Sequence, residues 1–399
     1  MYLEILLAIL AGVASGTLTG LIPGIHINLI SLLVLTSSPF LLQHFPPLII
    51  AVFIISMAVT HSFLDSIPGI YLGAPDESMA LAALPGHRML LKGLGHHAVL
   101  LTIIGSFLSL ILCLTLAPSL LFLVKSIYPI IKNYIGHILI IIMAYMILKD
   151  SKRKLNFIVF SMSSILGLIT LNIANTENVL FPLLSGLFGF SILIKSILSH
   201  NNLPGQIERV LRIRNRNIKK AALGATSVGF MASFLPGFGS SQAAIIATQF
   251  LKDIGDKGFL ILVGGINTVN MTLSLITLYA LEKARNGAVI VISKILQALT
   301  LTNLITLYAS VLIAGCCAVW LAVHLSKLFS TLIQKVNYKM LVISILLFTA
   351  ILVFYFDSFI GILILITSTA VGLFAGELGV GKNHCMGCLI LPVILYFIL

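Results

Sequence analysis

Glycine- and proline-containing breaks inside hydrophobic stretches constrain the fold of this chain more than any other feature. One break contains the pair Pro23-Gly24, and the other contains the pair Pro236-Gly237, a little over half the chain length further on. Proline inside a helix removes a backbone hydrogen bond and clashes with the preceding turn. Each pair therefore predicts a broken or re-entrant helix. Breaks at corresponding places in two hydrophobic halves are the sequence pattern that points to a transporter's substrate site.

The composition places nearly the whole chain in a lipid bilayer. Only 9% of residues are charged and 59% are hydrophobic, whereas soluble proteins have about 25% charged residues. No Asp, Glu, Lys or Arg occurs from Ile5 to Leu64. A spanning helix needs roughly 20 apolar residues, and the sequence offers roughly ten such hydrophobic segments. We therefore predict an all-α polytopic protein that crosses the cell (cytoplasmic) membrane several times.

The positive charge is explained by membrane topology and not by nucleic-acid binding. The net charge is +12, and the basic residues concentrate at 149–154 and 208–220. Basic loops beside hydrophobic spans mark the cytoplasmic side of a membrane protein. We accordingly divide the transmembrane domain into two halves, 1–198 and 221–399, joined by a basic cytoplasmic linker at 199–220. We expect the halves to be repeats of inverted topology.

Each half contains a second hydrophobic segment that carries polar side chains. In the first half it runs from Thr60 to Gly69, and in the second from Gly264 to Thr272. An unsatisfied polar group costs several kcal/mol in lipid, so such segments must face protein or a wet cavity. Two broken helices and two polar helices together predict a cavity near the middle of the membrane.

The breaks also indicate what kind of solute such a cavity binds. Amide groups at the start of the half-helix after each Pro-Gly pair carry partial positive charge and favour an anion. An anionic or zwitterionic solute is therefore expected; the alternative is that the small residues only allow close helix packing. The substrate-binding candidates are Pro23, Gly24, His26, Asn28, Pro68, Gly69, Pro236, Gly237, Gly239, Ser240, Ser241, Gln242, Asn267 and Asn270.

Two side chains of the first polar segment are candidates for ion coupling. Asp65 follows sixty uncharged residues, and an acid at membrane depth is a default proton or Na⁺ ligand. The alternative is that the helix ends there and Asp65 lies in water. His61 is a second candidate proton carrier, although a membrane histidine also serves as a hydrogen-bonding link between helices. No other cofactor, metal site or catalytic set is expected, since the chain has neither a His-Glu-x-x-His nor a Gly-x-Ser-x-Gly motif.

These motifs, in this order, resemble the large permease subunit of the tripartite tricarboxylate transporters, the TctA-like family. The resemblance rests on Gly16–Gly24, Ile67-Pro-Gly69, Ile104-Gly-Ser-Phe107, Leu235-Pro-Gly-Phe-Gly239 and the segment Asn267–Asn270. The chain departs from the family at Pro85-Gly-His-Arg88, where the family has Asp-Gly-Tyr-Pro. The resemblance implies a secondary transporter of carboxylates that works with a small membrane subunit and an extracytoplasmic binding protein.

We therefore interpret the chain as an ion-gradient-driven permease for a small organic anion, with a carboxylate as the expected solute. Alternating access would move one bundle against another around a site between the broken helices. The alternatives are a translocase of a lipid-linked phosphate, which suits the same helix ends, and a membrane-embedded enzyme.

Overall fold

The regular structure of the chain is helical throughout the part described. The computed structural model describes residues 2–22, 27–73, 79–149, 152–173, 179–198, 204–207, 215–234, 239–251, 254–284, 286–333 and 338–399. Within these ranges, seven helices are long and apolar enough to cross a membrane, and four shorter apolar helices accompany them. The predicted all-α polytopic membrane fold is confirmed. Both Pro-Gly pairs lie outside the described residues.

The helices of the first half precede the linker, and those of the second half follow it. The first set is α1 (Tyr2–Leu21), α2 (Ile27–Thr36), α3 (Ser38–His44), α4 (Pro47–Leu64), α5 (Ser66–Tyr71), α6 (Ala83–Leu90), α7 (Gly95–Ile131), η2 (Lys132–Tyr134), α8 (Ile135–Lys149), α9 (Arg153–Leu171), α10 (Leu180–Leu184), the π-helical η3 (Ser185–Phe190) and α11 (Ser191–Leu198). The second set is α12 (Asn215–Phe234), α13 (Ser240–Phe250), α14 (Gly255–Leu281), α15 (Gly287–Leu296), α16 (Leu301–Ile333), α17 (Tyr338–Glu377), η4 (Lys382–Met386) and α18 (Gly387–Ile398).

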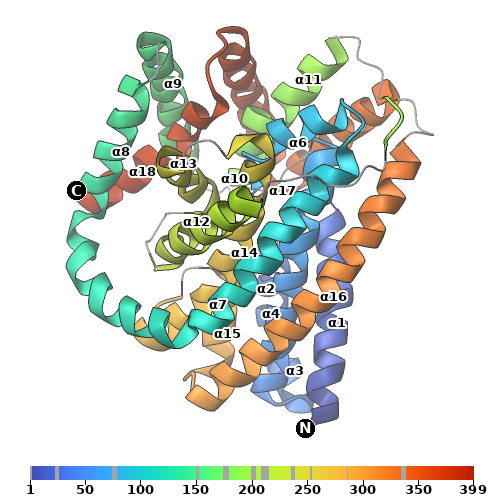
Figure 1. The fold of residues 1–399 in the computed structure, drawn as a ribbon, viewed down its shortest axis with the longest axis vertical. Helices are drawn as coiled ribbons and strands as arrows, with labels where there is room; N and C mark the ends of the chain where they lie inside the picture. The colour runs from blue at the N-terminus through green and yellow to red at the C-terminus, as the bar shows by residue number, and fades with distance from the viewer. Residues whose placement is uncertain are drawn as a thin grey trace.

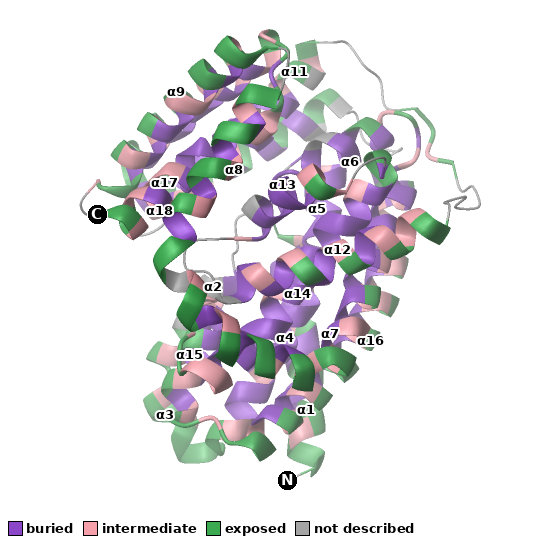
Figure 2. Cartoon of the chain, turned by 60° about the vertical axis from the view of Figure 1, so that its left-hand side comes forward, coloured by how far each residue is buried: buried purple, intermediate pink, exposed green. Residues whose placement is uncertain are grey.

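Two groups of helices pack mainly among themselves. The first, here called the central bundle, contains α1, α2, α4 to α7 and α12 to α16. The second, here called the side bundle, contains α8 to α11, α17, η4 and α18, and it draws on both halves of the sequence. Figure 1 shows α7 running from the central bundle toward α8, and Figure 2 shows α8, α9, α17 and α18 together at one end of the molecule.

The helices α4 and α14 form the interior of the central bundle. In their most apolar windows 83% and 89% of residues are buried, against 33–50% for the other five long helices. The helix α4 packs along α1 and α16, and α14 packs along α12 and α7. Each of the two thus contacts both the helix that precedes a Pro-Gly pair and a long helix of the other half. The polar segments identified in the sequence lie at the junction of α4 with α5 and in α14.

Glycines allow the central helices to approach closely. A Cβ atom on Gly12 of α1 would lie 2.6 Å from the Phe53 carbonyl oxygen of α4. Similarly, a Cβ on Gly105 of α7 would overlap the Ile261 carbonyl oxygen of α14, beside a hydrogen bond of 3.0 Å from Ser106 Oγ to the Gly264 carbonyl. Lipid provides no hydrophobic force between helices, so association depends on such close van der Waals and polar contacts.

The long α17 is two helices joined by a sharp reversal. Ser358 has φ 54° and ψ −147°, which no helical residue adopts. A Cβ on Gly361 would lie 3.0 Å from the Val353 carbonyl oxygen, although eight residues of straight helix span about 12 Å. The chain therefore folds back at Ser358, and each arm has the length of a membrane span.

The described part of the predicted linker includes the start of a helix and a short segment that is hydrogen-bonded to the chain near α7. The helix α12 begins at Asn215, inside the range 199–220 assigned to the linker. Within the described residues 204–207, the Ile207 N–H donates to the Gly93 carbonyl at 2.8 Å, and Gln206 Oε1 accepts from the Gly95 N–H at 2.9 Å. This part of the linker is held at the start of α7. The division into two repeats stays a prediction.

The contact between α7 and α14 gives a first prediction. Replacing Gly105 with Val should destabilise the protein by about 2 kcal/mol or more, since overpacking a close interface forces backbone shifts. Thermal unfolding of the purified protein in detergent measures the change. Gly205→Val is the control, because a Cβ on Gly205 meets nothing within 4 Å. Equal melting temperatures for the two variants would contradict the prediction.

Candidate functional site

Asp65 lies inside a nearly continuous helical stretch of membrane-spanning length. The helix α4 ends at Leu64 and α5 begins at Ser66, with Asp65 itself in the right-handed helical region. The break follows from Pro68, which has no N–H to offer the Leu64 carbonyl four residues earlier. The stretch from Pro47 to Tyr71 has 25 residues, and Asp65 is only 2% exposed. The carboxyl group is therefore buried in protein, and it does not lie in water at a helix end.

Asn267 of α14 provides the hydrogen bond to this carboxyl group. Its Nδ2 donates to Asp65 Oδ2 at 2.8 Å and to the Ser62 carbonyl oxygen at 3.3 Å. The amide is 6% exposed. A donor at this distance stabilises the ionised carboxylate, which would otherwise be costly in so dry an environment. The bond joins the predicted ion-coupling residue of the first half to the predicted asparagine helix of the second.

A second asparagine reaches the helix that follows the second Pro-Gly pair. Asn270 lies three residues after Asn267, and its Nδ2 donates to Ser240 Oγ at 3.3 Å. Ser240 is the first residue of α13, and Gly239 before it is extended, with φ −84° and ψ 179°. Residues three apart share a helix face. One face of α14 thus contacts both the end of α4 and the start of α13.

The helices that precede the two Pro-Gly pairs are tied to the same polar helices. His61 Nδ1 of α4 is hydrogen-bonded to Thr19 Oγ1 in the last turn of α1, at 3.1 Å. In the second half, Thr277 Oγ1 of α14 donates to the Ser233 carbonyl oxygen in the last turn of α12, at 3.1 Å. The helix end that enters each break is therefore fixed by a side chain from the adjacent buried helix.

The remaining predicted residues fall into three groups. Pro68 and Gly69 lie buried in α5, within one turn of Asp65, and Ser241 lies buried in the first turn of α13. The side chains of Asn28 and Gln242 are outside the description, although both residues belong to helices. The predicted residues that fall wholly outside the described ranges are Pro23, Gly24, His26, Pro236 and Gly237.

Sequence reasoning missed several partners of these residues. Thr19, Ser62, Ser233 and Thr277 each supply one side of a hydrogen bond described above. Thr19 carried a usable signal, since it precedes Gly20 in the small-residue pattern of α1. Ser62 and Ser233 contribute backbone oxygens, which no side-chain pattern reveals. A pairing between positions about two hundred residues apart also leaves no trace in a single sequence.

The arrangement offers a carboxylate and a set of neutral donors close to a helix start. Hydroxyl groups of Ser240 and Ser241 lie in the first turn of α13, where the helix dipole favours an anion. Asp65 supplies the negative charge that a proton or Na⁺ requires. No group of three or more His, Cys, Asp or Glu side chains forms a metal site among the residues searched, which are those that the structure describes.

Two comparisons with known proteins match nearly the whole length of this chain. A sequence model of the Tripartite tricarboxylate transporter TctA family matches residues 6–387. An uncharacterized protein of Methanocaldococcus jannaschii is 30% identical over 404 residues, covering 98% of this chain and 99% of the relative. No solved structure matches the chain. The family match includes both Pro-Gly pairs and every residue of the candidate site.

The bond between Asp65 and Asn267 gives a second prediction. Asp65→Ala and Asn267→Ala should each lower the free energy of unfolding by about 1–3 kcal/mol, because each removes one side of the buried 2.8 Å hydrogen bond between the two side chains. The double variant should be little worse than either single one, since contacting residues are not additive. Unfolding of all three variants in detergent measures this coupling.

Asn172→Ala is the matched control, because Asn172 is exposed and its Nδ2 donates within its own segment, to the Leu168 carbonyl at 2.7 Å. Its stability should stay close to that of the unchanged protein. Strictly additive effects of the Asp65 and Asn267 substitutions would contradict a direct interaction.

Proposed function

Since the chain belongs to the tripartite tricarboxylate transporter TctA family, we propose that it is a permease that carries a small organic anion across the membrane. The solute is a carboxylate, and an ion gradient drives its movement by alternating access. The observation that carries the proposal is the hydrogen bond of 2.8 Å between Asn267 and Asp65. It links the one buried acid of the first polar segment to the helix that holds the start of α13.

The substrate site lies at the start of α13. The α13 start lies at the positive end of the helix dipole, and Ser240 and Ser241 add hydroxyl groups. Asn270 holds Ser240 in place through its side-chain amide. A carboxylate bound here accepts hydrogen bonds from these hydroxyl groups. Gly239 supports close approach, since no side chain separates its backbone from a ligand.

Ion coupling follows from the shared helix face of α14. A proton or Na⁺ at Asp65 competes with the Asn267 amide for the carboxylate oxygen, because a protonated or metal-bound oxygen is a poorer acceptor. Asn270 lies one turn further on the same helix and bonds to Ser240. Ion binding at Asp65 therefore changes a contact of α14, and the same helix holds Ser240 of the anion site through Asn270.

The proposed partners and location follow from the family. The protein acts in the cell membrane with a small membrane subunit and an extracytoplasmic binding protein. In the first half α1 packs along α4, and in the second half α12 packs along α14. This correspondence supports an internal repeat around the site. An enzymatic role is not proposed.

Transport by the purified protein in liposomes tests this function. Uptake of radiolabelled carboxylates should depend on an imposed Na⁺ or proton gradient. Asp65→Asn should reduce that dependence about tenfold or more, since a neutral amide takes up no proton and lacks the charge that attracts Na⁺. Asp256→Asn is the control, because Asp256 is half-exposed at the start of α14. Unchanged ion dependence in Asp65→Asn would remove Asp65 from the mechanism.

Substitutions at the start of α13 test the anion site separately. Gly239→Val and Gly237→Val should abolish uptake, and Ser240→Ala should weaken it about tenfold, while each variant still folds. Size-exclusion chromatography and thermal unfolding check the folding. Normal uptake by both glycine variants would contradict the site, and uptake of lipid-linked phosphates in place of carboxylates would favour a translocase.

A further inference from the structure

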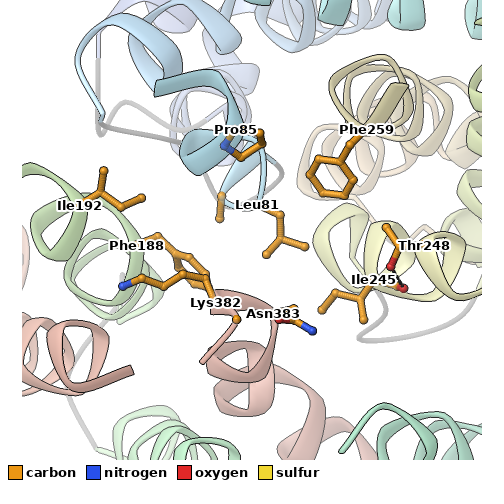
Figure 3. A pocket seen from close by; sticks show the side chains of 11 residues that line it. Leu81, Pro85, Phe188, Ile192, Ile245, Thr248, Phe259, Lys382 and Asn383 are labelled. Atoms are coloured by element: carbon orange, nitrogen blue, oxygen red, sulfur yellow. Dashed lines mark hydrogen bonds between the residues drawn. The ribbon is translucent and has the colours of Figure 1, made fainter. Parts of the chain in front are cut away.

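A pocket lies between the two bundles, and it shares no lining residue with the proposed transport site. Its volume is about 260 Å³. The central bundle contributes Leu81, Pro85, Ile245, Thr248 and Phe259, and the side bundle contributes Phe188, Ile192, Lys382 and Asn383 (Figure 3). Figure 3 shows Leu81 reaching into the middle, with Phe259 and Phe188 on opposite sides. Ligand pockets commonly lie at such boundaries between packed units.

The walls of this pocket are mostly apolar, with polar groups confined to two places. Thr248 Oγ1 already donates to the Ile245 carbonyl at 2.6 Å, within α13. Asn383 and Lys382 lie next to each other on η4 at the opposite wall. Figure 3 shows the stem of Lys382 along this wall and its Nζ beside Phe188. An occupant therefore needs an apolar body and a polar group at the η4 end only.

Lys382 carries a positive charge that no carboxylate balances in the part of the chain that the structure describes. Its Nζ donates to the Gly372 carbonyl at 2.6 Å, to Ser191 Oγ at 2.6 Å and to the Leu187 carbonyl at 3.1 Å. By contrast, the exposed Lys195 pairs with Glu377 at 3.1 Å. A partly buried ammonium group among neutral oxygens favours an anion nearby, because attraction is strong where water is scarce.

One of the three bonds of Lys382 can be exchanged for a ligand at little cost. The Leu187 carbonyl is its most distant acceptor, and that carbonyl also accepts from Ser191 Oγ at 2.6 Å. If Nζ turns toward the pocket, the Leu187 oxygen keeps the Ser191 hydroxyl as its partner. A buried acceptor is costly only when it loses every donor.

The size and the single charge define the class of ligand. A cavity of about 150 Å³ lined by apolar side chains admits benzene, so 260 Å³ holds a ring of that size together with a carboxylate. A tricarboxylate would place two further charges against Leu81, Ile245 and Phe259, and burying an unpaired charge is very costly.

We propose that this pocket binds an organic anion with one carboxylate and an apolar body of about benzene size, its carboxylate lying beside Lys382 and Asn383. The site is independent of the transport proposal, since it shares no residue with the substrate and ion sites. Its occupant touches both bundles and therefore stabilises the arrangement seen here.

Calorimetric titration of the purified full-length protein in detergent tests the site with three probes. Benzoate should bind saturably, whereas the neutral benzyl alcohol and the trianion citrate should bind at least tenfold more weakly at the pocket. Absence of benzoate binding, or citrate binding that benzoate displaces with equal affinity, would overturn the proposal. Neither result would bear on liposome uptake, so the two proposals fail separately.

Two substitutions in opposite walls locate the bound benzoate. Lys382→Met removes the charge and keeps the stem, and Leu81→Phe fills the middle of the pocket; each should weaken benzoate binding at least tenfold. Lys195→Met and Leu120→Phe are matched controls that should leave it unchanged, because neither residue lines the pocket. If Lys382→Met fails to fold, the benzoate affinity of Leu81→Phe is the measurement that tests the site. Undiminished affinity in Leu81→Phe would place benzoate elsewhere and refute the site.

Discussion

The burial of one carboxyl group in a membrane protein determines much of the arrangement of this chain. Asp65 lies within a helical stretch of spanning length, where a charge facing lipid would be prohibitively costly. Its bond to Asn267 requires α4 and α14 to meet. Both helices must then be shielded from lipid by others, and α1, α7, α12 and α16 surround them. The glycines of α1 and α7 permit the short distances that this enclosure needs.

Composition and polar patterning were sufficient to predict the membrane fold and the two innermost helices. The segments Thr60–Gly69 and Gly264–Thr272 stood out because lipid does not tolerate such side chains, and both are buried within the central bundle. The sequence left Asp65 undecided between membrane depth and a helix end in water. Pro68 made the second reading reasonable, since proline interrupts a helix. The structure resolves this, because a new helix resumes immediately after Asp65.

The pairing of helices could not be predicted from one sequence. The pairing of Asp65 with Asn267 depends on how two helices far apart in the chain are rotated against each other. The side bundle joins α8 to α11 with α17 and α18, so it crosses the boundary drawn between the two sequence halves. Hydrophobic periodicity reports which residues avoid water, but it contains no information about which helix covers them. The Pro-Gly pairs, which the sequence marked most strongly, remain predicted sites outside the described residues.

The two bundles differ in how a relative displacement would affect their polar contacts. The bonds of Asn267 with Asp65 and of Asn270 with Ser240 lie wholly within the central bundle. The bonds of Lys382 with Leu187, Ser191 and Gly372 lie wholly within the side bundle. The pocket, by contrast, has walls from both bundles. A sliding of one bundle past the other would therefore reshape the pocket while leaving both sets of hydrogen bonds intact. Because apolar contacts are less directional than hydrogen bonds, the mostly apolar walls of the pocket oppose such a displacement less than the hydrogen-bonded contacts inside each bundle do.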